Sequence, residues 1–131
     1  MIDWRWLGRV DHADAVAQQE ARRREIHAGD PTAQAVFLCE HPPVITLGHA
    51  ADRRHVLIDD AEAARRGITI AAASRGGDVT YHGPGQLMIY PVVRVRSVVE
   101  FLATVAGAIA ELCAELGVAG VEFRRAPAGL W

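Results

Sequence analysis

The spacing of apolar residues along the chain predicts a series of short strands. Residues 2–10 form the first, in which period two places Trp4 and Trp6 on one face. Pro42 and Pro43 interrupt the apolar pattern further on, and because proline lacks an amide donor they predict a stiff corner between two strands. Five further apolar runs are each typical of a strand: 35–39, 44–47, 68–73, 87–93 and 118–123.

Residues with helical spacing and capping signals lie between these runs. Asp11 can cap a helix that continues to about His27, and a brief second helix over residues 59–66 ends at Gly67. In the first helix, small residues recur at every fourth position and predict a narrow stripe for close packing: Ala13, Ala17 and Ala21.

A third helix is predicted in the last part of the chain. Ser97 and Glu100 form an S-x-x-E capping box, and the helical pattern runs from there to about Leu116. Its apolar positions predict a buried stripe that consists of Phe101, Val105, Ile109, Leu112 and Leu116.

Strands and helices therefore follow one another in mixed order. Two pairs of strands are joined by loops alone, which favours the α+β class: a mixed β-sheet with helices packed on it. Residues 74–86, with four glycines and a proline, are expected to lack regular structure. The length of 131 residues suits a single domain over residues 1–131.

Composition and charge narrow the classes of function. Half of the residues are hydrophobic, 23% are charged and the net charge is −2, so no broad basic surface is available for nucleic acid or an anionic membrane. No apolar stretch is long enough to span a membrane, and the charged N-terminus lacks the apolar core of a secretory signal. We expect a cytoplasmic protein with no nucleic acid and no membrane among its partners.

Candidate chemistry is concentrated in the glycine-rich segment. Its central stretch carries guanidinium, hydroxyl, phenol and imidazole groups. The glycines around them permit close approach of the backbone to a ligand. A passive hairpin loop is the alternative, but the density of such groups favours a binding site. The candidate substrate-binding residues are Arg75, Gly76, Gly77, Asp78, Val79, Thr80, Tyr81 and His82.

Two blocks of the sequence resemble a known family. The run RGGDVTYHGPGQLMIYP, which begins at Arg75, is similar to the signature of lipoyl(octanoyl) transferases, the lipoate-protein ligase B family. The block EHPPVITLG, which begins at Glu40, is similar to the same family's EHPPVYTLG segment and lies at the expected distance upstream. The two blocks in this order make the resemblance specific. It covers this chain but only the N-terminal part of a typical family member.

The resemblance implies both a fold and a reaction. The fold would be that of the catalytic domain of biotin and lipoate protein ligases. Family members move octanoyl from octanoyl-acyl carrier protein, through a cysteine thioester, to a lysine on lipoyl domains of 2-oxoacid dehydrogenases and on the glycine cleavage H protein. By position, Arg75 to His82 would line the acyl pocket, with His82 orienting polar groups at the reacting centre. His41, in the second block, would lie near the same pocket.

The catalytic residues of the family have no counterpart here. The resemblance places its nucleophilic cysteine, and the lysine that lowers the thiol pKa, in a C-terminal portion missing from this chain, which contains no lysine. Cys39 and Cys113 lie in apolar segments and are expected to pack in the core, so no catalytic residue is assigned. A truncated product, one half of a split enzyme and a pseudoenzyme all remain open. We expect the chain alone to be inactive and to associate.

Three other functions are alternatives to octanoyl transfer. An ATP-dependent lipoate or biotin ligase is disfavoured because Gly-Pro-Gly-Gln follows His82, whereas lipoate ligases continue H-D-x-G-N. A non-catalytic module that binds an acyl chain, its carrier protein or a lipoyl domain remains the alternative function. A metal site is disfavoured because the loop histidines His41, His49, His55 and His82 lack helical zinc spacing, so neither metal nor cofactor is expected.

Overall fold

Two short mixed sheets dominate the first part of the molecule. The computed structural model describes residues 1–125 and 128–131, and the chain divides into two compact units, Met1–Val93 and Arg94–Trp131. Each unit is described by itself below. The expectation of a single domain over residues 1–131 stays a prediction.

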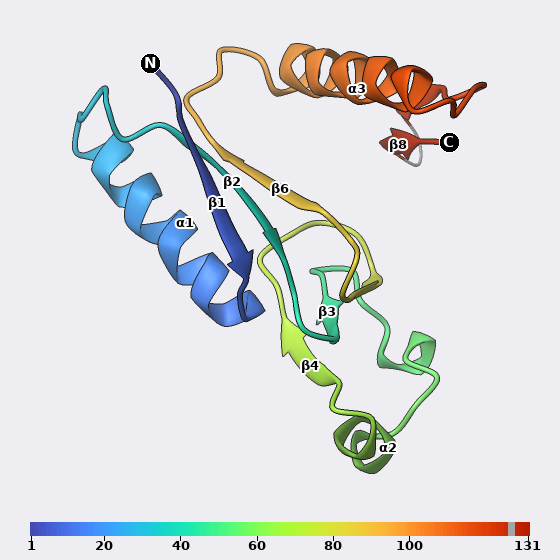
Figure 1. Ribbon diagram of the computed structural model, residues 1–131. Helices are drawn as coiled ribbons and strands as arrows, with labels where there is room; N and C mark the ends of the chain where they lie inside the picture. Colours follow the sequence, from blue (N-terminus) through green and yellow to red (C-terminus); the bar gives the residue numbers. More distant parts are fainter. Residues whose placement is uncertain (126–127) are drawn as a thin grey trace. The chain divides into compact units, whose positions relative to one another are not determined.

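The first sheet combines β1 (Asp3–Arg9), β2 (Ala35–Glu40) and β6 (Met88–Val92), with β2 in the middle. Figure 1 shows the three strands side by side. β1 runs parallel to β2 and β6 runs antiparallel, so the sheet is mixed. Its central strand is almost wholly apolar and supplies much of the core: Ala35, Val36, Phe37 and Cys39 are buried. Trp4 pairs with Val36 and Trp6 with Leu38, which confirms that the two tryptophans share a face.

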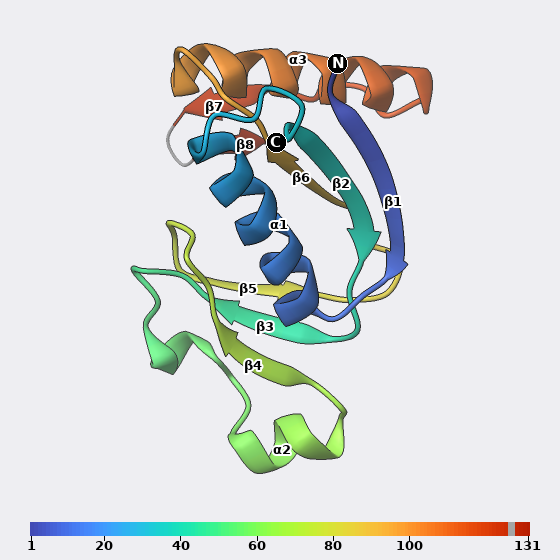
Figure 2. The ribbon, with the colours of Figure 1, turned by 90° about the vertical axis from the view of Figure 1, so that its left-hand side faces the viewer.

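α1 (His12–His27) runs alongside this sheet and contacts β6 (Figure 2). The stripe predicted for its covered face was wrong, because Ala13 and Ala17 are exposed and Ala15 is buried instead. The chain enters the helix directly from β1, and this short connection turns a different face inward. That face carries polar as well as apolar residues, which the small-residue pattern did not reveal.

The second sheet combines β4 (Thr69–Ala72), β3 (Val44–Leu47) and β5 (Val79–His82), with β3 in the middle (Figure 2). β4 is parallel to β3 and β5 is antiparallel. β5 corrects the expectation that residues 74–86 lack regular structure. The glycines only flank this strand, and its β-branched and aromatic residues pair with the buried β3.

Short elements complete the first unit. Pro42 and Pro43 form the predicted corner between β2 and β3, since one strand ends at Glu40 and the next begins at Val44. The 3₁₀-helix η1 (Arg53–His55) follows, and then α2 (Asp60–Arg65), which packs against β4. The Asp59 side chain accepts a hydrogen bond from the Glu62 amide and caps α2, close to the predicted start.

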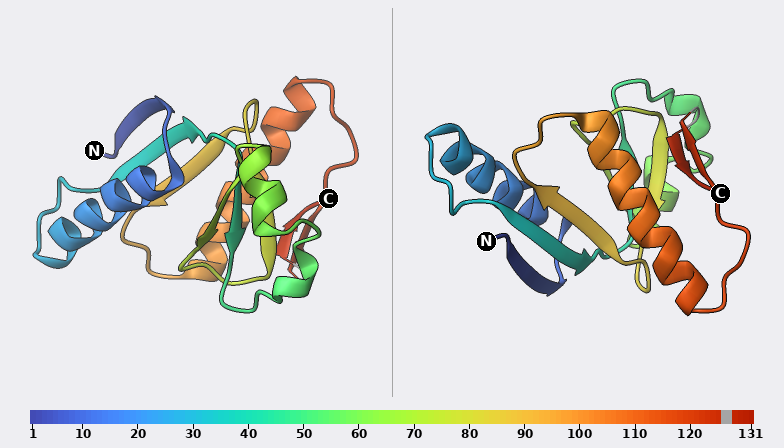
Figure 3. Two further views of the ribbon diagram at one scale, coloured as in Figure 1. Left: turned by 90° about the horizontal axis from the view of Figure 1, so that it is seen from below. Right: turned by 90° about the horizontal axis from the view of Figure 1, so that it is seen from above.

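The second unit consists of α3 (Val98–Glu115) and a hairpin of β7 (Phe123–Arg125) and β8 (Ala128–Leu130) (Figure 3). Ser97 caps α3 through the Glu100 amide, as the capping box predicts. The strand expected over residues 118–123 was wrong, because regular pairing starts only at Phe123. Gly120 has a φ of +77°, which interrupts an extended backbone.

The apolar stripe of α3 is only partly covered. Its N-terminal members Phe101, Val105 and Ile109 are half-buried, whereas Leu112 and Leu116 are exposed, contrary to the prediction. The hairpin strands that contact α3 have three residues each, so they cover less length than the helix offers. Among the helices that the structure describes, none combines the length and apolar character needed to cross a membrane.

Candidate functional site

A pocket of about 320 Å³ opens beside the glycine-rich segment of the first unit. Its walls come from α1, β3, β5, β6 and the connection between β4 and β5, so several elements must fold together to form it. A larger depression of about 450 Å³ lies against α2 and β4 and shares none of these residues. The smaller pocket is lined by His12, Val16, Gln19, Thr46, Ala73, Ser74, Arg75, Thr80, His82, Met88 and Tyr90.

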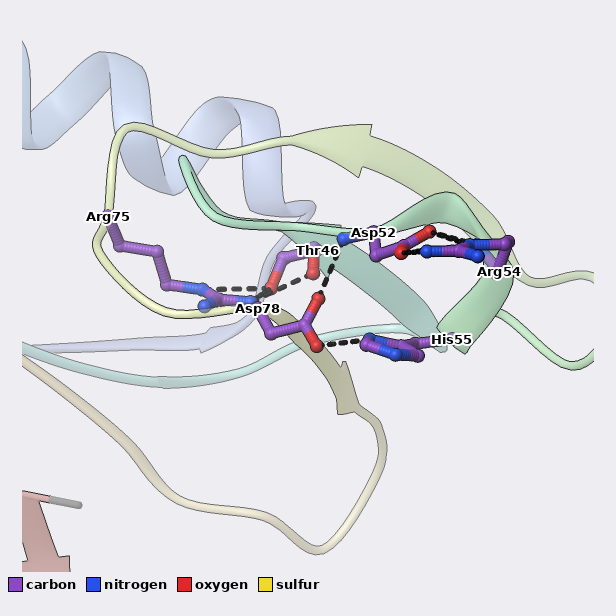
Figure 4. A network of polar contacts seen from close by, with 6 residues as sticks. All are labelled: Thr46, Asp52, Arg54, His55, Arg75 and Asp78. Atoms are coloured by element: carbon purple, nitrogen blue, oxygen red, sulfur yellow. Dashed lines mark hydrogen bonds and ion pairs between the residues drawn. The ribbon is translucent and has the colours of Figure 1, made fainter.

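Arg75 is held in place by the protein before any ligand binds (Figure 4). Its Nη2 donates to the backbone oxygen of Thr46 and to Thr46 Oγ1, both at 2.8 Å, and its Nη1 donates to the Gly76 oxygen at 3.0 Å. Thr46 is only 1% exposed and lies in the central strand β3. The guanidinium therefore forms a fixed, positively charged wall of the pocket rather than a mobile side chain.

Backbone hydrogen bonds from residues 48–50 hold the segment 75–78 in place. The amides of Gly48, His49 and Ala50 donate to the backbone oxygens of Asp78, Arg75 and Gly77 at 2.9–3.1 Å. A Cβ atom at Gly48 would lie 2.4 Å from the Gly77 oxygen, so only glycine fits at this position. Two loops that lie far apart in sequence are thereby joined into one rigid rim.

Asp78 is turned toward the protein (Figure 4). One carboxylate oxygen accepts from the Asp52 amide at 2.9 Å, and the other contacts His55 Nδ1. The hydrogen bond from the Asp52 amide and the contact with His55 lower the pKa of Asp78. Asp78 thus ties η1 to the glycine-rich segment and does not line the pocket.

A buried histidine and a tyrosine support the floor of the pocket. His41 is fully buried; its Nδ1 donates to the Val10 oxygen at 2.7 Å, so its Nε2 accepts from the Tyr90 hydroxyl at 2.8 Å. Burial raises the pKa of Tyr90 to about 12, so the hydroxyl keeps its proton at neutral pH. His41 lies behind the pocket and Tyr90 lines it.

Two further imidazoles face the same space. His82 Nδ1 donates to Gln86 Oε1 at 2.8 Å, and its Nε2 lies 3.5 Å from Thr46 Oγ1. His12 lies with its ring centre 5.5 Å from that of His41. Burial, together with the nearby His41, His82 and Arg75, lowers the pKa of His12, which favours a neutral ring at pH 7.

The candidate binding residues divide by the pleat of β5. Thr80 and His82 alternate on the side that lines the pocket, together with Arg75 from the loop before the strand. Tyr81 points the other way and is 53% exposed. The candidates outside the pocket lining are Gly76, Gly77, Asp78, Val79 and Tyr81.

Sequence reasoning missed the wall that α1 supplies. His12, Val16 and Gln19 are spaced i, i+4 and i+7, which places them on one helical face. The same spacing is visible in the sequence, but the packed face of the helix was predicted from the alanine repeat instead. Met88 and Tyr90 were also missed, although their period-two spacing places both on one face of β6.

Cys39 does not contribute a nucleophile to this pocket. Cys39 is buried, and burial raises the pKa of its thiol, which confirms the predicted core role. Cys113 is only half-buried and lies in the other unit. In the part of the chain that the structure describes, no three His, Cys, Asp or Glu side chains form a cluster that could hold a metal ion.

Comparison with solved structures shows the fold. Lipoate-protein ligase A bound with ATP has a TM-score of 0.69 at 19% identity, over 88% of this chain and 47% of that one. Protein Ta0514 of T. acidophilum, with bound lipoic acid, has a TM-score of 0.67 at 19% identity, over 88% of this chain and 48% of that one. Both confirm the expected α+β fold of lipoate protein ligases.

Comparison with curated proteins gives relatives named octanoyltransferase. The one from Acidobacterium capsulatum is 40% identical and that from Desulfotalea psychrophila is 36% identical, over 86% and 95% of this chain. The one from Myxococcus xanthus is 37% identical over 95% of this chain. The chain spans 50%, 57% and 36% of these three relatives, respectively. The model of the lipoyl protein ligase A/B catalytic domain matches residues 11–131, and the chain belongs to this family.

Proposed function

We propose that this chain provides the acyl-binding part of an octanoyltransferase. The donor would be octanoyl-acyl carrier protein, and the acceptor would be a lysine on lipoyl domains of 2-oxoacid dehydrogenases or on the glycine cleavage H protein. The observation that carries the proposal is the pocket itself, where Arg75, Thr80 and His82 of the glycine-rich segment meet an apolar wall. The family and the names of the relatives support the same reaction.

The pocket suits a medium-length acyl chain with a polar head. Val16, Ala73 and Met88 offer apolar surface to a hydrocarbon tail, while Arg75 and His82 offer polar groups to a thioester head. A volume of about 320 Å³ lies at the lower end of the range for small-molecule sites. Because Arg75 and Tyr90 are already fixed by hydrogen bonds, little ordering would be needed when the ligand binds.

The atoms and bonds of the proposed transfer balance without a cofactor. The bond between the octanoyl carbonyl carbon and the carrier sulfur breaks, an amide bond forms to the lysine nitrogen, and the carrier leaves as a thiol that takes up the amine proton. The residues described here bind and orient the acyl group. Cys39 does not suit the role of nucleophile, because its thiol is buried and its pKa is raised.

Calorimetric titration with acyl carrier protein tests acyl binding. We expect the octanoyl-loaded carrier to bind at least about tenfold more tightly than the unloaded carrier, because the octanoyl tail buries apolar surface in the pocket. Ala73→Phe fills the pocket and should abolish this difference. Ala72→Phe is the matched control, since Ala72 is next to Ala73 in the sequence but is exposed and lies outside the pocket lining. Equal affinity for the loaded and unloaded carriers would contradict the proposal.

The same samples separate binding from turnover. The alternative function is a binding module, either catalytically dead or one subunit of a split enzyme, and it predicts tight acyl binding without transfer. Incubation with octanoyl carrier protein and a lipoyl domain, followed by mass spectrometry, measures octanoylation directly. We expect none from this chain alone, since it contains no lysine to lower a thiol pKa. Octanoylated lipoyl domain would rule out the binding-module alternative.

A further inference from the structure

Gln19 carries a buried hydrogen-bond donor for which the part of the chain described by the structure supplies no acceptor. It lies two turns into α1, on the face that forms one wall of the pocket. Its Nε2 is buried, and the described residues supply no hydrogen-bond partner for it. Buried polar atoms nearly always have a partner, and an unsatisfied one destabilises the fold. A ligand that brings an acceptor into the pocket would explain the position of this atom.

Other polar side chains of the pocket are already engaged with the protein. Arg75 donates to Thr46, and the Tyr90 hydroxyl donates to His41. The two ring nitrogens of His82 face Gln86 Oε1 and Thr46 Oγ1. These contacts consume donors and acceptors before a ligand arrives. The Gln19 amide differs from them because its Nε2 is buried and has no hydrogen-bond partner among the described residues, although Gln19 belongs to the pocket lining.

The chemistry of an acyl thioester identifies the matching acceptor. Val16 lies one turn before Gln19 on the same helical face, and Met88 lines the pocket from β6, so hydrocarbon can pack against both. A hydrocarbon tail cannot accept a hydrogen bond, whereas the thioester carbonyl oxygen can. We propose that Gln19 is a specificity-determining residue whose Nε2 donates to the carbonyl oxygen of a medium-chain acyl thioester. This inference rests on the acyl-binding function proposed above.

Such a contact would select acyl over alkyl ligands. A ligand without the carbonyl leaves the Gln19 donor unsatisfied in the bound state, and sites built around a hydrogen bond discriminate strongly against analogues that lack it. The same hydrogen bond would fix the direction in which the acyl group lies. The Gln19 contact would therefore position the carbonyl carbon for attack.

A pair of probes tests the contact. S-octanoyl-pantetheine carries the carbonyl, and S-octyl-pantetheine is its thioether analogue without it. We expect Gln19→Leu and Gln19→Met to lower affinity for the thioester by about 5- to 100-fold and to leave affinity for the thioether unchanged, as measured by calorimetry. Gln18→Leu is the matched control, because this neighbouring glutamine lies outside the pocket lining.

Thermal unfolding without ligand gives a second, independent measurement. Removing an unsatisfied donor should leave the melting temperature of both Gln19 variants unchanged or raised. A large drop in both variants would show a structural role and overturn the inference. If both variants bind the thioester and the thioether with unchanged affinities, the inference about Gln19 is also overturned. That result would not contradict the proposed acyl binding. If the unmutated chain binds neither probe, the proposed function fails as well.

Discussion

Arg75 and Asp78 lie three residues apart in the same glycine-rich segment, yet their side chains serve different neighbours. Arg75 donates to Thr46 and forms a wall of the pocket. Asp78 accepts from the Asp52 amide and contacts His55, outside the pocket (Figure 4). Both residues were candidates for substrate binding. At the scale of single residues, the segment therefore combines ligand-facing groups with groups that hold its own shape.

Gly48 gives a prediction at this scale. In Gly48→Ala the new methyl group would lie 2.4 Å from the Gly77 oxygen and 2.9 Å from Arg75 Nη1. The oxygen cannot move away without losing the hydrogen bond that it accepts from the Ala50 amide, so we expect a loss of about 1–3 kcal/mol in the free energy of unfolding. Urea denaturation measures it. Gly76→Ala is the control, since a Cβ there meets no atom within 4 Å. Equal stability of the two variants would show that the rim is not rigid.

At the scale of elements, the pocket depends on how strands and helices meet. The i, i+4, i+7 face of α1 supplies one wall, and alternate residues of β5 and β6 supply others. His41 follows β2 and connects the end of β1 to β6, through the Val10 oxygen and the Tyr90 hydroxyl. One buried imidazole thus links three strands of the first sheet behind the pocket.

Removing the Tyr90 hydroxyl tests this link. Tyr90→Phe leaves the buried His41 Nε2 with only the weak contact to the Cys39 thiol at 4.0 Å, so we expect a loss of about 1–3 kcal/mol in the free energy of unfolding. On a His41→Leu background, the substitution Tyr90→Phe should change the free energy of unfolding much less. A double-mutant cycle measures this difference. Additive effects of the two substitutions would mean that the hydrogen bond contributes nothing. Tyr81→Phe is the control, because Tyr81 is exposed.

At the scale of the whole molecule, large apolar side chains remain on the surface. Trp4 and Trp6 are 65% and 61% exposed on β1, at the edge of the first sheet, and Ile89 on β6 is 41% exposed. The register places Trp6, Leu38 and Ile89 across one face of that sheet. Contiguous apolar surface of this kind promotes association.

Replacing both tryptophans tests this surface. We expect Trp4→Thr/Trp6→Thr to reduce self-association of the purified chain, as measured by sedimentation velocity at several concentrations. Threonine keeps the preference for a strand while it removes the apolar area. Leu57→Thr is the control, since Leu57 is 93% exposed and lies outside the first sheet. If the double variant and the control associate to the same extent, another surface drives association.

Features of this protein that depend on local sequence could be predicted, whereas features that depend on distant contacts could not. The residue types of the binding segment, the capping box at Ser97 and the central strands β2 and β3 could all be predicted, because each depends on neighbours a few positions away. β5 could not be predicted, because its four residues are partly polar and lie between glycines, so no local apolar run marks them and only pairing with β3 makes them a strand. The covered face of α1 was missed for a similar reason: the connection from β1, not the helix's own composition, sets its orientation.

The sequence alone determined the α+β class, the family resemblance and the chemical groups available between Arg75 and His82. Tertiary structure alone decided which of those groups line a pocket, since the pleat of β5 turns Thr80 and His82 to one side and Tyr81 to the other. It also brought Gln19 of α1 to the same pocket. The reason is physical: local preference depends on adjacent residues, whereas a binding site depends on side chains that only long-range packing brings together.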